Sequence, residues 1–105
     1  MTIPPLDADA AARVASFGDI PPMRQRGLMV VRAEIESAPH PEDMAVMAQI
    51  ENRAIPGPAG RIPLRIYRPS ADPVAPVLVY FHGGGMVLGT NHSFEPLARA
   101  LAAAC

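Results

Sequence analysis

The apolar residues of the first 45 positions recur at helical spacing. Asp7 precedes an alanine-rich run that reaches about Phe17 and is followed by Gly18, which predicts a capped helix. A second run, from Met23 to Ala38, has apolar residues three and four positions apart and follows a Pro-Pro pair typical of a helix start. The Pro-His-Pro sequence after it is expected to end that helix.

From Met44 the period of the pattern shortens to two residues. Apolar side chains alternate with their neighbours from Val46 to Glu51 and again from Ile62 to Tyr67, as they do in half-buried strands. The sequence between them, Pro-Gly-Pro-Ala-Gly, is typical of a turn. We therefore predict a β-hairpin whose second strand ends at Pro69.

A run of apolar residues from Val77 to Phe81 is rich in β-branched and aromatic types and has no polar alternation. This pattern predicts a central strand buried on both faces. The run leads directly into His82 and three consecutive glycines. Because glycine has no Cβ and tolerates positive φ, such a loop brings bare backbone N–H groups within reach of a ligand.

The last predicted element is a helix that begins near Ser93. The Ser93 hydroxyl can cap the helix, and Glu95 in the first turn suits the helix dipole. Its apolar residues fall on one face that is expected to pack on the sheet: Phe94, Leu97, Ala98, Leu101, Ala102 and Cys105.

Three chemistries could use the glycine loop. A dinucleotide-binding turn is one, since Gly83, Gly85 and Gly89 fit a loose variant of the fingerprint, although Leu88 stands where the strict pattern requires glycine. That reading also needs a helix to open within the glycines, and the first good helix start is ten residues after Gly83. A purely structural turn is the second reading. An oxyanion hole is the third.

Composition narrows the class of protein. The chain has 105 residues, of which 50% are hydrophobic, enough for one domain or part of one. A net charge of −1 gives no sign of a nucleic acid or an anionic membrane as partner. All nine basic residues are arginine, which excludes Schiff-base and Ser–Lys chemistry.

The compartment is predicted from what the sequence lacks. A single cysteine excludes an internal disulfide framework, the first residues show no secretory signal, and no apolar segment is long enough to span a membrane. We expect a cytoplasmic protein.

The sequence His82-Gly83-Gly84-Gly85 resembles the HGGG motif of the hormone-sensitive-lipase-like esterases, a family of α/β-hydrolases. The resemblance implies that the amides of Gly83 and Gly84 form an oxyanion hole. It also implies that His82 and Gly85 shape the loop. Met86 stands where the family often has an aromatic residue, on the acyl-side wall of the pocket.

The resemblance covers about the last 60 residues well and includes the hairpin sequence. It implies that residues 1–45 are an N-terminal helical cap segment and that residues 46–105 are the N-terminal part of an α/β-hydrolase core. The activity it implies is hydrolysis of a small carboxylic ester through an acyl-serine intermediate, with no cofactor and no metal.

The catalytic nucleophile, acid and base of that family are not found in these residues. None of the four serines lies in a G-x-S-x-G elbow, and each is explained as a helix, turn or cap residue: Ser16, Ser37, Ser70 and Ser93. His40 lies in a linker between prolines. A metal site of His82, His92 and Cys105 has no supporting spacing, and Cys105 is expected to be a core thiol.

We therefore expect the chain to be the N-terminal part of an esterase that is truncated before the nucleophile elbow. It should be inactive alone, and its expected partner is the missing C-terminal part of the fold. Two alternatives stay open. One is a dinucleotide-binding fragment of an oxidoreductase, and the other is a non-catalytic interaction protein.

Overall fold

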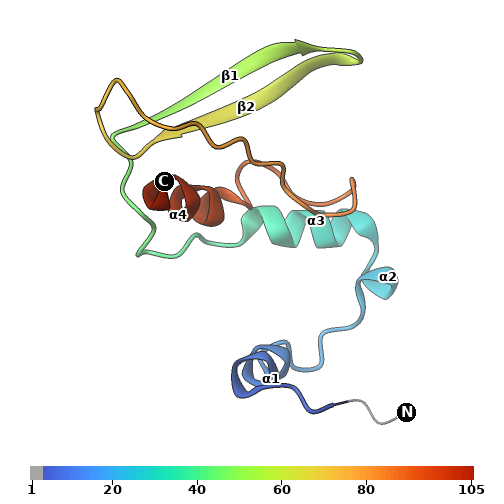
Figure 1. Cartoon of the computed structure of the whole chain (residues 1–105). Coiled ribbons are helices and arrows are strands. Elements are labelled where there is room, and N and C mark those ends of the chain that lie inside the picture. Colours follow the sequence, from blue (N-terminus) through green and yellow to red (C-terminus); the bar gives the residue numbers. More distant parts are fainter. Residues whose placement is uncertain (1–3) are drawn as a thin grey trace. The chain divides into compact units, whose positions relative to one another are not determined.

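The computed structural model describes residues 4–105 (Figure 1). The chain forms two compact units that divide between Val31 and Arg32, and each is considered by itself. None of the helices within residues 4–105 is long and apolar enough to cross a membrane.

The first unit begins with α1, Ala8–Ala15. Its start is the predicted one, because the Asp7 side chain accepts a hydrogen bond of 3.1 Å from the Ala10 amide. The helix ends at Ala15, and the chain reaches Gly18, which has a φ of 53°, through a turn. The predicted cap and helix are therefore confirmed, with an end slightly earlier than expected.

The predicted helix from Met23 to Ala38 is wrong as a single element. It is divided into α2, Met23–Arg26, and α3, Leu28–Ser37. Gly27 separates them with a φ of 84°, a left-handed conformation that ends a helix and that glycine adopts without steric cost.

The predicted hairpin is confirmed in the second unit. Strands β1, Gln49–Gly57, and β2, Gly60–Arg68, pair antiparallel, with Gly57 opposite Gly60 across a two-residue turn. Gly60 has a φ of 130°, which accounts for glycine at the turn. The first strand starts three residues later than the alternation from Val46 predicts, since it begins where pairing with Arg68 begins.

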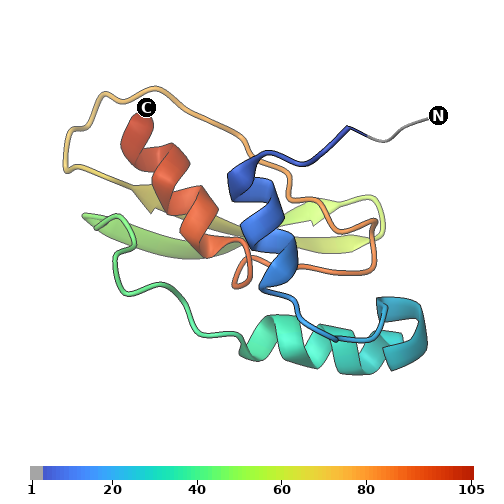
Figure 2. The same cartoon turned by 90° about the horizontal axis from the view of Figure 1, so that it is seen from below.

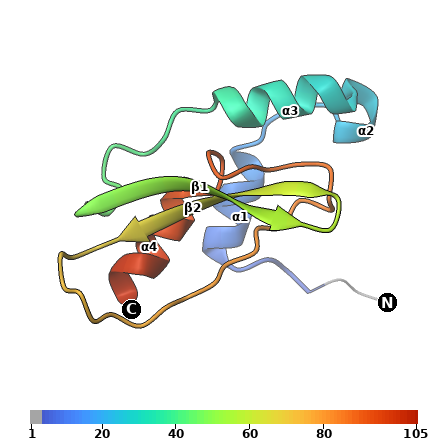
Figure 3. The ribbon, with the colours of Figure 1, turned by 90° about the horizontal axis from the view of Figure 1, so that it is seen from above.

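Helix α4, Glu95–Ala104, lies beside β2 on one face of the hairpin (Figures 1 and 3). Ser93 is not its cap, because the Ser93 hydroxyl accepts a hydrogen bond of 2.9 Å from the Thr90 amide instead. The predicted apolar face is only partly covered. Phe94, Ala98, Leu101 and Ala102 are half-buried, whereas Leu97 and Cys105 are exposed.

The prediction of a central strand at Val77–Phe81 is not met. The segment is extended but forms no strand (Figure 2), and within residues 4–105 the sheet consists of β1 and β2. Val77 is 87% exposed and Phe81 86%. A strand exists only where a neighbouring backbone supplies hydrogen bonds, and this run has no such neighbour among the described residues.

Candidate functional site

The three glycines open a tight turn. Gly84, Gly85 and Met86 have φ values of 117°, 60° and 63°, all in the left-handed range. The turn closes on the Gly84 carbonyl, which accepts hydrogen bonds from the amides of Val87 at 3.2 Å and Leu88 at 3.0 Å. Met86 is a residue with a Cβ in a conformation that costs about 1–2 kcal/mol, so the turn is locally strained.

Glycine is required sterically at two positions around this turn. A Cβ on Gly84 would lie 2.0 Å from the Leu88 carbonyl oxygen, and one on Gly89 would lie 2.7 Å from the Phe94 ring. Gly83 differs, because a Cβ there would meet nothing within 4 Å. Glycine at 84 and 89 is thus explained by packing, whereas glycine at 83 leaves open space beside its backbone.

The amides of Gly83 and Gly84 are the predicted oxyanion donors. Neither N–H donates a hydrogen bond to any group within residues 4–105. Strands and helices normally satisfy such groups, and an oxyanion hole requires them to be available. The structure therefore leaves two successive donors available, and their assignment to an oxyanion stays a prediction.

His82 and Phe94 stack against each other beside the turn. Their ring centroids are 5.1 Å apart with an interplanar angle of 21°. Nδ1 of His82 lies 2.7 Å from the Gly83 carbonyl oxygen, and because a carbonyl only accepts, Nδ1 carries the proton in this contact. The ring thus contacts the backbone at the first glycine, and the role of His82 in shaping the loop stays a prediction.

Met86 and His82 both line a small hollow beside the glycine turn. Met86 is fully exposed. The hollow encloses about 270 Å³, and its lining combines the glycine turn with two charged residues of α3: Arg32, Glu36, His82, Met86, Val87, Leu88, Gly89 and Thr90. The Met86 side chain borders this hollow. Its place on an acyl-side wall of the pocket stays a prediction.

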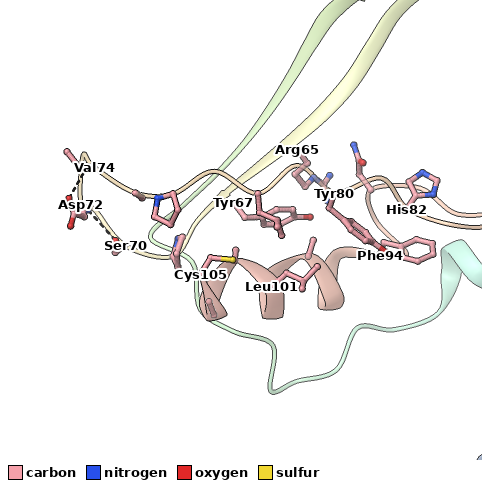
Figure 4. A pocket seen from close by; sticks show the side chains of 18 residues that line it. Arg65, Tyr67, Ser70, Asp72, Val74, Tyr80, His82, Phe94, Leu101 and Cys105 are labelled. Carbon is pink, nitrogen blue, oxygen red and sulfur yellow. Dashed lines mark hydrogen bonds between the residues drawn. The ribbon is translucent and has the colours of Figure 1, made fainter.

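A larger cavity of about 490 Å³ lies between β2, the extended segment after it and α4 (Figure 4). Figure 4 shows the Tyr67 ring above α4. The Tyr67 hydroxyl is buried without a hydrogen-bond partner among the described residues. Burial, with the nearby negative charge of Glu95, raises the pKa of Tyr67 above its ordinary value.

Glu95 is the one buried charged residue of the described chain, with 7% of its surface exposed. One carboxylate oxygen accepts from Arg65 of β2 at 2.7 Å, and the other accepts from Arg99 at 2.9 Å. Burial acts to raise the pKa of Glu95, but the two guanidinium groups outweigh it and the pKa is lowered. The ion pair of Glu95 with Arg99 could be predicted from their four-residue spacing on a helix. No feature of the sequence indicates the ion pair with Arg65.

His82, His92 and Cys105, whose spacing in the sequence does not support a metal site, do not form a group of possible ligands in the structure. Within residues 4–105 the group whose ligand atoms lie close enough for one ion is His40, His92 and Glu95. Both oxygens of Glu95 are held by arginines, and Nε2 of His40 lies 2.9 Å from the His92 carbonyl oxygen. This group is an ion-pair and hydrogen-bond cluster, and two guanidinium charges beside it disfavour a cation.

The serine hydroxyls have local roles. Each is hydrogen-bonded to backbone within three residues: Ser16 to Arg13, Ser37 to Glu34, Ser70 to Asp72 and Ser93 to Thr90. The prediction of a core thiol at Cys105 is wrong, because this residue directly follows the end of α4 and is exposed. The dinucleotide reading gains no support either, since α4 begins at Glu95 and presents no helix end to Gly83.

Comparison with known proteins points to one class, the carboxylic ester hydrolases. The chain is 42% identical over 69 residues to the carboxylic ester hydrolase LipN of Mycobacterium tuberculosis, a match that covers 66% of the chain and 18% of LipN. Esterase LipI of the same organism is 43% identical over 80 residues, covering 70% of the chain and 23% of LipI. Carboxylesterase NlhH is 39% identical over 80 residues, covering 70% of the chain and 24% of NlhH.

These matches establish a partial homology. About 70% of the chain is homologous to part of the hormone-sensitive-lipase-like α/β-hydrolases, which confirms the resemblance to that family. The chain spans between 18% and 24% of the length of these three relatives. No family model matches the chain.

Proposed function

We propose that this chain supplies the oxyanion-binding part of a carboxylic ester hydrolase. The observation that carries the proposal is the pair of successive amides at Gly83 and Gly84, which have no acceptor within residues 4–105. They belong to a chain that is homologous to carboxylesterases. Ester hydrolysis through an acyl-serine intermediate places negative charge on the carbonyl oxygen, and paired amides stabilise that charge.

Each named residue has one role in this proposal. The amides of Gly83 and Gly84 bind the oxyanion, and one such donor is worth roughly 2.7–4 kcal/mol in the transition state. His82 holds the Gly83 carbonyl and so fixes the start of the turn. Gly85 continues the left-handed turn with a φ of 60°, and Met86 borders the acyl group of a small ester.

The nucleophile, acid and base belong to polypeptide outside these residues. The serine hydroxyls of this chain are hydrogen-bonded to nearby backbone. The matched part covers 18% of LipN and 23% of LipI, which leaves room for a nucleophile elbow and for strands that pair with Val77–Phe81. The cytoplasm is the compartment we propose, and the reaction needs no cofactor.

The test uses the chain alone and in a chimera in which it replaces the corresponding N-terminal region of LipN. The 105-residue chain should neither turn over a short-chain p-nitrophenyl ester nor react with a fluorophosphonate probe above the level of a Gly83→Pro control. The chimera should hydrolyse the ester. Stoichiometric serine labelling of the chain alone, or a folded chimera without activity, would overturn the proposal.

A further inference from the structure

Three side chains spaced four residues apart hold the segment that follows the glycine turn. Arg32, Glu36 and His40 each bind a different point between residues 87 and 92. All of these residues belong to the second unit of the chain. Residues four apart on a helix share one face, so Arg32 and Glu36 lie on the same face of α3, and His40 follows three positions past the end of the helix.

The first two contacts come from α3 itself. Nε of Arg32 donates to the Val87 carbonyl at 2.7 Å, directly after the turn closes. The Thr90 hydroxyl donates to the Glu36 carboxylate at 2.6 Å. Both are charge-assisted hydrogen bonds, which are the stronger kind, and both span more than 50 residues of sequence.

His40 provides the third contact. Its Nε2 lies 2.9 Å from the His92 carbonyl oxygen, and its ring contacts the His92 ring at a centroid distance of 4.1 Å and an interplanar angle of 30°. Because a carbonyl only accepts, Nε2 of His40 carries the proton. This contact holds the chain just ahead of α4, so the three contacts together follow the loop from the glycine turn to the start of that helix.

A strained turn needs such support. Met86 has a Cβ and a φ of 63°, and such a conformation persists only where the surroundings hold the backbone in place. The two hydrogen bonds to the Gly84 carbonyl come from Val87 and Leu88, and Val87 is the residue that Arg32 binds. Movement of Val87 would therefore open the turn.

We infer that Arg32, Glu36 and His40 are positioning residues that hold the glycine turn in shape. They act through Val87, Thr90 and His92 and touch neither amide at Gly83 or Gly84. Their meaning for catalysis rests on the proposed function, since they would set the geometry of the oxyanion donors. Their effect on the turn itself depends on the contacts alone.

The test follows backbone amides of the 105-residue chain by proton–nitrogen correlation spectra and hydrogen exchange. Arg32→Met, Glu36→Met and Thr90→Val each remove one partner of a contact while keeping side-chain bulk. In each variant the Gly84 and Gly85 cross-peaks should move, and exchange of the Leu88 amide should become about tenfold faster.

Matched control variants remove an arginine or a glutamate that takes no part in these contacts, or keep the Thr90 hydroxyl. Arg24→Met and Glu42→Met discharge exposed residues, and Thr90→Ser keeps the hydroxyl. All three should leave the glycine cross-peaks in place. Gly57 and Gly60 of the hairpin turn report on general unfolding. Unmoved glycine peaks in the contact variants, or equal movement at Gly57 and Gly60, would overturn the inference.

The same variants in the LipN chimera separate this inference from the proposed function. Thr90→Val should lower kcat with little change in KM, and Thr90→Ser should restore kcat. If the cross-peaks move as expected while Gly83→Pro leaves the activity of the chimera unchanged, the positioning contacts stand and the oxyanion assignment fails.

Discussion

Gly83 and Gly84 are neighbours, yet a methyl group meets different surroundings at each. At Gly84 it would lie 2.0 Å from the Leu88 carbonyl oxygen on a backbone with a φ of 117°, whereas at Gly83 nothing lies within 4 Å. Gly84→Ala should therefore open the turn and speed exchange of the Leu88 amide by about tenfold or more, because left-handed strain alone costs about 1–2 kcal/mol.

Gly83→Ala is the control for that variant and should leave Leu88 exchange unchanged. An unchanged Leu88 amide in Gly84→Ala would show that the turn is held differently from the structure.

The residues of the glycine turn could be predicted from their order, but their roles could only partly be separated. Consecutive glycines after an apolar run indicate backbone that approaches a ligand, and the resemblance to the HGGG motif implied Gly83 and Gly84 as the donors. The sequence carries no signal that Gly84 packs against Leu88 or that Met86 takes a φ of 63°. Both depend on how the turn closes in three dimensions.

At the scale of helices and strands, the sequence predicted those features that depend on interactions between residues close together in the chain. The α1 cap at Asp7 and the hairpin turn follow from side-chain chemistry within a few residues. The prediction of a strand at Val77–Phe81 was wrong because a strand requires a neighbouring strand to pair with, and residue composition does not reveal whether one is present. The prediction of one long helix from Met23 was wrong because the helical spacing of apolar residues continues across Gly27. The positive φ of Gly27 divides the helix in two.

Glu95 joins α4 to β2 and makes the stability of that contact depend on pH. Burial opposes ionisation of Glu95, but Arg99 and Arg65 lower its pKa below the ordinary value of 4.5. A lowered folded-state pKa stabilises the fold fully above the ordinary value, and the stabilisation is lost as pH falls through the folded-state pKa.

Glu95→Gln should therefore cost about 1.5–3 kcal/mol of unfolding free energy at pH 7 and much less at pH 3, as measured by urea denaturation. Glu42→Gln, at an exposed position, provides the control. A Glu95→Gln cost that is equal at the two pH values would contradict the ion-pair account.

At the scale of the molecule, few apolar side chains within residues 4–105 are covered. Val31 is the one buried hydrophobic residue among residues 4–105, and the strand-forming run Val77–Phe81 stays exposed. The chain matches relatives of which it spans at most 24%. These observations agree with the proposal that the activity requires further polypeptide, because a hydrophobic core of this class forms on both faces of a sheet.

The oxyanion assignment is tested most directly by paired variants at one position in the LipN chimera. Gly83→Pro removes the amide hydrogen, whereas Gly83→Ala keeps it and adds a methyl group in open space. We expect Gly83→Pro to lower kcat about 10²–10³-fold and Gly83→Ala to keep kcat within a few-fold of the unmodified chimera. Equal kcat values for the two variants would contradict a role for this amide in binding the oxyanion.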